Sequence, residues 1–267
     1  MPESSAAIGI FDSGVGGLTV FARIAEDLPN ESIIYLGDTA RVPYGTKSGE
    51  TILRYAAGCA DVLVERGIKM LVVACNTASA HALDSLRDEL AIPVLGVIIP
   101  GARSAVDLSR SGRIGIIGTA STIASKAYEE AILGMAPEAS VFSKSCPLFV
   151  PLAEEGWLHG AVPRQIAAAY LEELLPHHID TLVLGCTHYP LLREVIQEAI
   201  GPDVTLVDSA QATSRAVAET LTGLGMKRDA ASPPSHTFLV TDAPGAFARV
   251  GERFLGRATS PVEWVDV

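Results

Sequence analysis

The amino-acid sequence predicts an α/β fold of two pseudo-symmetric domains, each a mainly parallel sheet flanked by helices, with an active site in the cleft between them. Short β-rich runs alternate with helix-patterned stretches along the 267 residues, the order expected of parallel strands joined by right-handed crossovers. Most β-rich runs are continuously apolar, as parallel strands covered on both faces are. A weak internal repeat indicates that the chain consists of two similar halves.

The expected elements follow from these patterns in chain order. We predict strands at 8–12, 32–36, 70–75, 93–98, 114–118, 139–143, 180–185, 203–207 and 236–241. Amphipathic stretches predict helices at 50–67, 79–90, 163–175 and 191–200.

Three matches in the same order make up the internal repeat. IGIFDS begins at Ile8, and IGIIGT begins 106 residues later, at Ile114. VVACNTAS and LVLGCTHYP each end a strand in a cysteine, Cys75 and Cys186, which are 111 residues apart. PVLGV and DVTLV then follow the two cysteines at similar intervals. Each match is short enough to arise by chance, so it is the common order that favours duplication.

The repeat also sets the expected domain boundaries. The segment after residue 207 falls outside the repeat, and we expect it to return to complete the first half. The first domain then covers residues 1–98 plus 208–267, and the second covers 99–207. Open α/β sheets bind ligands at the carboxyl ends of their strands, so two facing halves would share one cleft.

Composition and charge exclude several classes of function. The formal net charge is -11, which argues against a nucleic-acid partner because a phosphate backbone needs a basic face. A small anionic substrate is still compatible, since a local pocket can be positive within an acidic protein. The start, MPESSAAIGIF, lacks a basic n-region and a long apolar h-region, and no stretch approaches the roughly 18 apolar residues of a membrane span. We therefore expect neither signal peptide nor membrane association.

The four cysteines form no CxxC pair and no disulfide-framework spacing. In a chain this large and apolar, reduced thiols and a cytoplasmic location are the better interpretation. Cys59 lies in a helical apolar pattern and Cys146 precedes a proline in a loop-like stretch, so both are interpreted as structural. Cys75 and Cys186 differ, because each stands at a strand-to-helix junction.

A helix N-terminus favours the thiolate, because the helix dipole and the free N–H groups stabilise negative charge. The sequence therefore predicts that the pKa of Cys75 and Cys186 lies below the usual value of about 8.5. Thr77 and Thr187 are the expected helix caps, and the N–H groups beside them would form an anion site.

Two thiols on opposite sides of one cleft suit one kind of chemistry. A thiol protease needs one cysteine and a histidine base, and a redox enzyme needs two sulfurs close enough to bond. Inverting a carbon stereocentre by proton transfer needs a base on one face of the carbon and an acid on the other. A thiolate and a thiol that exchange roles with the direction of reaction meet this requirement.

Polar residues near the first two strand ends could assist this chemistry. Asp12 follows the first strand, and Ser13 and a glycine turn come next. The turn is not GxGxxG, and Asp12 would repel a phosphate there. The loop after the second strand contains Asp38 and then Pro43, Tyr44 and Gly45, a run that an ordinary turn explains equally well.

Two further candidates lie in the second half. His188 follows Cys186 by two residues and could adjust that thiol or bind the substrate, although a lone histidine is usually structural. Glu154 is a candidate carboxylate whose alternative interpretation is a solvated surface acid. The six histidines do not cluster at ligand spacing and no lysine demands a Schiff base, so we expect neither a metal nor a pyridoxal cofactor.

Six motifs together resemble one family closely: IGIFDSGVGGLTV, YLGDTARVPYGTKS, VVACNTASA, IGIIGTASTIAS, CPLFVPLAEEG and LVLGCTHYPLL. They are similar to glutamate racemase, a cofactor-independent amino-acid racemase that supplies D-glutamate for peptidoglycan. The matches run in order from about residue 8 to about residue 210, and the last 55 or so residues contribute little.

The resemblance implies roles for particular residues. Cys75 would be the base that acts on the D-substrate and Cys186 the base that acts on the L-substrate. Asp12 and His188 would assist their neighbouring thiols, with Glu154 as a further assisting acid. The implied substrate-binding residues are Asp12, Ser13, Pro43, Tyr44, Gly45, Asn76, Thr77, Thr119, Thr122, Thr187 and His188. The resemblance also implies a homodimer and no cofactor.

Three alternatives stay open at this point. A racemase of aspartate or another amino acid could use the same fold, whereas a related decarboxylase would keep only one of the two thiols. A non-catalytic protein could bind an acidic metabolite in the cleft. A thiol redox protein would instead form a disulfide between Cys75 and Cys186 under mild oxidation.

Overall fold

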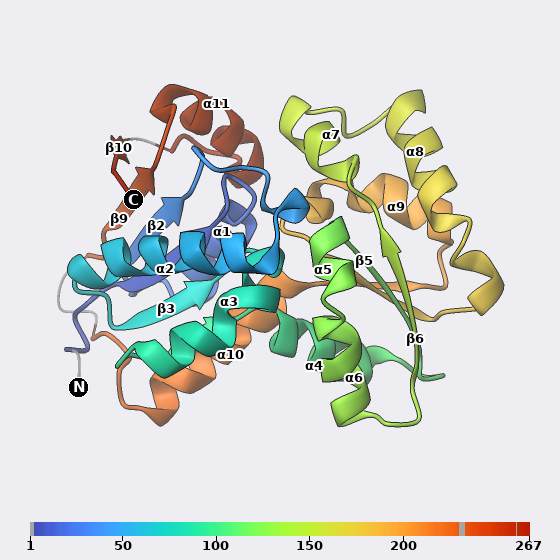
Figure 1. Cartoon of the computed structure of the whole chain (residues 1–267), viewed down its shortest axis with the longest axis horizontal. Helices are drawn as coiled ribbons and strands as arrows, with labels where there is room; N and C mark the ends of the chain where they lie inside the picture. The colour runs from blue at the N-terminus through green and yellow to red at the C-terminus, as the bar shows by residue number, and fades with distance from the viewer. Residues whose placement is uncertain (1–2, 230–232, 260) are drawn as a thin grey trace.

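The computed structural model describes residues 3–229, 233–259 and 261–267 and confirms the predicted fold class. Figure 1 shows two halves side by side, each built on a sheet whose strand pairs are all parallel among the described residues. The first sheet has the order β10-β9-β2-β1-β3-β4, and the second has the order β6-β5-β7-β8.

The strands of the first sheet are β1 (Ile8–Asp12), β2 (Ile33–Gly37), β3 (Met70–Val73), β4 (Val94–Gly96), β9 (His236–Val240) and β10 (Val262–Trp264). Those of the second are β5 (Arg113–Gly118), β6 (Ser140–Ser145), β7 (Thr181–Gly185) and β8 (Thr205–Asp208). All nine predicted strands are therefore confirmed, with small shifts at their ends. The sequence did not predict β10, because its short exposed run lacks the buried apolar pattern.

The helices are α1 (Leu18–Asp27), α2 (Gly49–Glu65), α3 (Asn76–Glu89), α4 (Ile98–Leu108), α5 (Ala120–Ala124), α6 (Ala127–Met135), α7 (Phe149–Glu155), α8 (Ala161–Leu171), α9 (Arg193–Ile200), α10 (Ser209–Gly223) and α11 (Pro244–Leu255), with 3₁₀ turns η1 (Tyr44–Thr46), η2 (Leu175–His177) and η3 (Tyr189–Leu192). The four predicted helices correspond to α2, α3, α8 and α9. No helix among the described residues is long and apolar enough to cross a membrane.

The two sheets repeat one topology. The strand order β2-β1-β3-β4 in the first sheet matches β6-β5-β7-β8 in the second, so β1 corresponds to β5 and β3 to β7. The strands that lead to the two cysteines therefore occupy equivalent places. The segment after residue 207 adds α10, which packs against α1 and α4, and then β9, which pairs with β2.

The central strand β1 shows why the strand sequences are continuously apolar. Ile8 and Ile10 belong to the core cluster shared with α1 and α10, whereas Phe11 points to the other face, where α2 and α3 lie. Both faces of the strand are covered, so alternate side chains are buried on opposite sides. Shortening Ile10 to alanine would cost about 2–5 kcal/mol of stability.

Candidate active site

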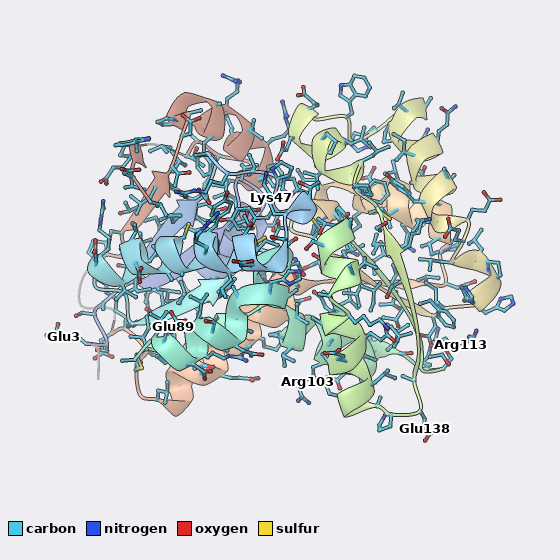
Figure 2. The ribbon with its side chains drawn as sticks, viewed as in Figure 1. Glu3, Lys47, Glu89, Arg103, Arg113 and Glu138 are labelled. Carbon is cyan, nitrogen blue, oxygen red and sulfur yellow. The ribbon has the colours of Figure 1, made fainter. Side chains whose placement is uncertain are left out.

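A cavity of about 350 Å³ lies where the carboxyl ends of the two sheets face each other. Twelve residues predicted from the sequence line it: Ser13, Pro43, Tyr44, Gly45, Cys75, Asn76, Thr77, Thr119, Glu154, Cys186, Thr187 and His188. Two others, Asp12 and Thr122, are buried just behind this wall. In Figure 2 the labelled Glu3 and Glu138 lie at the outer edges of the two halves, whereas Lys47 lies near the boundary between them.

Cys75 is itself the N-cap residue of α3. The strand β3 ends two residues earlier, and the Sγ of Cys75 accepts a hydrogen bond from the backbone N–H of Ala78 at 3.4 Å. The thiol lies 3.5 Å from the Oγ of Ser13 and is 5% exposed. The prediction of Thr77 as the cap is therefore wrong, since the thiol already occupies that position and Thr77 belongs to the first turn of the helix.

Burial raises the pKa of Cys75 to about 12, and the nearby Asp12 carboxyl adds to this effect. The hydrogen bond with Ser13 and the one from the Ala78 N–H act in the opposite direction but are smaller. The sequence predicted a lowered pKa from the helix N-terminus, and for Cys75 that prediction is wrong. A thiolate loses more from desolvation in this closed site than it gains from the helix start.

Asp12 ends β1 and is completely buried. Its Oδ2 accepts a hydrogen bond from the Gly14 N–H at 3.0 Å, while Oδ1 has no hydrogen-bond partner among the described residues. Burial raises the pKa of Asp12 above its usual value, although His188 lowers it in part. A Cβ at Gly17 would lie 2.5 Å from the Asp12 side chain, so the glycine turn is needed to enclose this carboxyl group.

Cys186 has a different setting from Cys75. It follows β7 directly, and the chain then forms the 3₁₀ turn η3, which no side chain caps in the described part of the chain. The prediction of Thr187 as a helix cap is therefore wrong. The Sγ of Cys186 lies 3.8 Å from Nδ1 of His188, and Nε2 of His188 lies 2.9 Å from a carboxylate oxygen of Glu154.

This chain of contacts keeps the imidazole cationic. Burial by itself disfavours the charged ring of His188, but the hydrogen bonds with Cys186 and Glu154 outweigh it and raise the pKa to about 10. A cationic imidazole beside a sulfur stabilises negative charge that forms there. The two predicted partners, His188 and Glu154, thus form one acid–base pair behind the second thiol.

The glycine turn of the first half fits against the two residues that follow the second thiol. A Cβ at Gly16 would lie 2.3 Å from the Thr187 hydroxyl and 2.5 Å from the His188 ring. The Thr19 hydroxyl also donates to the Thr187 carbonyl at 3.3 Å. The sequence indicated a flexible turn at this position, and its physical purpose is this close approach between the halves.

Hydroxyl and amide groups form the polar wall of the cavity. The Thr77, Thr119 and Thr122 hydroxyls lie within 3.0 Å of one another. Thr77 and Thr119 line the cavity, and the buried Thr122 supports them from behind. The Asn76 Oδ1 accepts a hydrogen bond from the Tyr128 hydroxyl at 2.7 Å. Its buried Nδ2 finds no partner within the described part of the chain, which leaves a donor available to an anionic ligand.

Most of the remaining wall is apolar, and sequence reasoning missed it. Val42, Pro147, Val150 and Pro151 line the cavity together with the predicted residues. Nothing in their type marked them as site residues, because only the packing of α7 against the cleft brings the last three there. Their nearest signal was their position inside two recognised motifs, ARVPYG and CPLFVPLAEEG.

The chain matches the family model for Asp/Glu/hydantoin racemase over residues 8–217. It is 58% identical to a curated glutamate racemase of Geobacter metallireducens, over 98% of this chain and 97% of the relative. The structure of glutamate racemase isoform RacE1 from Bacillus anthracis superimposes with a TM-score of 0.96 at 41% identity, covering 99% of each chain. A glutamate racemase from Francisella tularensis, solved in complex with D-glutamate, gives 0.93 at 40% identity and 98% of each chain.

The fold and the cleft with one thiol from each half define the class of protein, a racemase with an α/β architecture in two matching halves. The chain belongs to the Asp/Glu/hydantoin racemase family.

Proposed function

We propose that this protein interconverts L-glutamate and D-glutamate by moving the α-proton between two thiols, without a cofactor. The observation that carries the proposal is that Cys75 and Cys186 line one cavity, each from an equivalent strand and each with its own titratable partner. Two-base proton transfer requires this arrangement, because the proton must leave one face of the carbon and arrive at the other.

In the direction from L to D, the Cys186 thiolate accepts the α-proton, and the electron pair left on the carbon is delocalised into the α-carboxylate. The Cys75 thiol then donates its proton to the opposite face and becomes a thiolate. Its raised pKa suits this acid role, because burial keeps Cys75 protonated. In the reverse direction the Cys75 thiolate is the base and Cys186 is the acid.

Each thiol needs help when it acts as the base. We assign His188, with Glu154 behind it, to Cys186, because the imidazolium stabilises negative charge on the adjacent sulfur. We assign Asp12 to Cys75, because the carboxyl group lies close enough to affect that thiol's ionisation and keeps one oxygen without a partner among the described residues. The ammonium group of the substrate would bring compensating positive charge to this side.

Glutamate is the proposed substrate because curated relatives of that name align over nearly the full chain. The relative from Francisella tularensis was solved with D-glutamate and that from Escherichia coli with L-glutamate. The aspartate racemase homologues are 16–17% identical and share the fold alone. Ser13, Asn76, Thr77, Thr119 and Thr187 supply uncharged polar groups on the cavity wall for the substrate's ammonium and carboxylate groups.

Several broader expectations belong to the same proposal. D-glutamate made here would serve peptidoglycan synthesis in the cytoplasm, and the four free cysteines are compatible with a reducing compartment. The division into residues 1–98 plus 208–267 and 99–207 is supported by the two sheets. We also expect a homodimer, as the resemblance implies.

The experiment is proton NMR of the purified protein in heavy water with no added cofactor. L-glutamate, D-glutamate, L-aspartate and D-aspartate are offered separately, and the α-proton signals are followed. Loss of that signal from both glutamate enantiomers, with aspartate unchanged, is the expected result. Exchange of aspartate alone would retain the mechanism and change the substrate. Exchange of none of the four would favour a non-catalytic binding protein.

A further inference from the structure

Two buried acids stand at neighbouring strand ends of the first sheet, and their surroundings differ. Asp12 ends β1, and Asp38 follows β2, with the Asp38 N–H donating to the Asp12 carbonyl at 3.0 Å. Both side chains are completely buried. Asp12 keeps an oxygen without a partner among the described residues, whereas every oxygen of the Asp38 carboxylate accepts a hydrogen bond.

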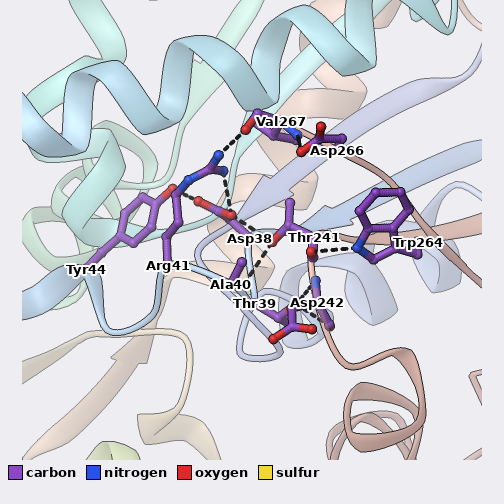
Figure 3. Close-up of polar contacts among 10 residues, drawn as sticks. All are labelled: Asp38, Thr39, Ala40, Arg41, Tyr44, Thr241, Asp242, Trp264, Asp266 and Val267. Carbon is purple, nitrogen blue, oxygen red and sulfur yellow. Dashed lines mark hydrogen bonds and ion pairs between the residues drawn. The ribbon is translucent and has the colours of Figure 1, made fainter.

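Figure 3 shows the partners of Asp38 converging on it. Its Oδ1 accepts from Nη1 of Arg41 at 3.0 Å and from the Thr241 hydroxyl at 2.8 Å. Its Oδ2 accepts from the Tyr44 hydroxyl at 2.5 Å. A fully satisfied buried carboxylate is a rigid centre, because moving any partner would leave a charge without compensation.

The Asp38 carboxylate and its partners join the loop after β2 to the carboxyl ends of β9 and β10. The Ala40 N–H donates to the Thr241 hydroxyl at 2.9 Å, and the Trp264 indole donates to the Thr241 carbonyl at 2.9 Å. The second guanidinium nitrogen of Arg41 donates to the Val267 oxygen. The segment beyond residue 207 therefore holds this loop in place, a role that its sequence did not indicate.

The loop held in this way forms one wall of the cavity. Tyr44 and Gly45 line the cavity together with Val42, Pro43 and Thr46, whereas Asp38 and Arg41 do not. The hydroxyl of Tyr44 points to Asp38 (Figure 3), so it is already used as a donor there and does not donate to a substrate. Burial raises the pKa of Tyr44 far above its usual value, with Cys59 and Asp38 adding to it, so the phenol keeps its proton.

We propose that Asp38 is a positioning residue, whose buried carboxylate fixes Tyr44 and Arg41 and thereby sets the shape of the cavity wall that receives the amino acid. This inference rests on the proposed function, because the cavity must bind a substrate for its wall to matter. It assigns Asp38 to substrate binding and separates it from the proton transfer in which Asp12 takes part. Both enantiomers meet the same wall, so the effect must be equal in the two directions.

The test is steady-state kinetics of Asp38→Asn with L-glutamate and with D-glutamate. We expect KM to rise about tenfold for both enantiomers, the size of effect that loss of a charge-assisted hydrogen bond produces, while kcat changes less than threefold. Primary isotope effects with α-deuterated substrates should stay as in the unsubstituted protein. Failure of the unsubstituted protein to racemise glutamate would count against the proposed function and not against this inference.

Two further variants keep the test decisive. If Asp38→Asn does not fold, Thr241→Val removes one hydrogen bond from the carboxylate and should raise KM about threefold. In the Tyr44→Phe variant, a second substitution Asp38→Asn should raise KM much less than Asp38→Asn does in the unsubstituted protein. Both substitutions remove the hydrogen bond between Tyr44 and Asp38. A fall in kcat at unchanged KM, or effects of the two substitutions that multiply independently, would overturn the proposal.

Discussion

The two thiols occupy equivalent places in matching sheets, yet their surroundings are opposite in charge. Cys75 caps a helix, lies near a buried carboxyl group and has a pKa raised to about 12. Cys186 precedes a 3₁₀ turn and contacts His188, whose pKa is raised to about 10. The duplicated backbone thus places two sulfurs on one cleft, while unrelated side chains determine how each sulfur carries charge.

This difference has a physical reason. The substrate enters with an ammonium group and carboxylates fixed in one orientation, so its two faces do not present the same charges to the two thiols. Cys75 beside the Asp12 carboxyl group and Cys186 beside the His188 cation can therefore both act as bases in one site. Pseudo-symmetry of the fold therefore does not require symmetry of the chemistry, and the following changes test how far the two sides differ.

Removing either thiol should have the largest effect. Cys75→Ala and Cys186→Ala should each lower kcat for racemisation by at least about 10³-fold, because one face of the carbon loses its only proton carrier. Both variants should still bind D-glutamate, measured as a ligand-induced rise in Tm. Cys59→Ala is the control, since this thiol is buried in the core and does not line the cavity. Retained turnover in either cavity variant would contradict the two-thiol scheme.

Substitutions of the residues that assist the two thiols should change the isotope effects in the two directions of the reaction differently. Asp12→Asn and His188→Asn should each lower kcat about 10²-fold with little change in KM. The enantiomers have equal free energies in water, so kcat/KM must be the same in both directions, and any asymmetry appears in the isotope effects. We expect a larger primary deuterium effect with D-glutamate for Asp12→Asn and with L-glutamate for His188→Asn. A change confined to KM would assign the residue to substrate binding.

The residues just discussed could be predicted from the sequence as candidates, because their signals lie within short stretches of the chain. The cysteines stand at strand ends within an internal repeat, and His188 follows its thiol by two positions. The pKa direction of Cys75 could not be found, since it depends on desolvation by residues distant in the chain. The family resemblance implies that Tyr44 contacts the substrate, but only the buried Asp38 reveals where its hydroxyl points.

The fold, like the site, could be predicted from the sequence only in part. Nine strands were predicted because buried parallel strands have a distinct composition, whereas helices such as α1 and α11 were missed although each has one apolar, buried face. The apolar wall of the cavity was missed as well. Val150 looks like any core residue until α7 is placed beside the cleft.

The cationic imidazole of His188 should also make the stability of the protein depend on pH. The pKa of His188 is raised above its usual value of 6.5 to about 10, so the folded state binds this proton more tightly than the unfolded state. That stabilisation is complete below about pH 6.5 and is lost as the pH rises towards 10. The free energy of unfolding from urea titrations should fall across this window by at least about 1 kcal/mol. His188→Asn should flatten the slope, and an unchanged slope would contradict a charged imidazole.

The smallest effect is expected from a residue that contacts His188 from outside the cavity. The ring of Phe254, on α11, lies 5.4 Å from the His188 ring in an edge-to-face arrangement, so it limits how the imidazole can turn. Phe254→Leu should lower kcat about two- to fivefold and raise the isotope effect with L-glutamate only, because the Cys75 side is untouched. Phe247→Leu, the same substitution on the same helix, is the matched control, since Phe247 packs against Tyr35. Equal isotope effects in both directions would mean that α11 supports the fold in general and affects the Cys75 side and the Cys186 side alike.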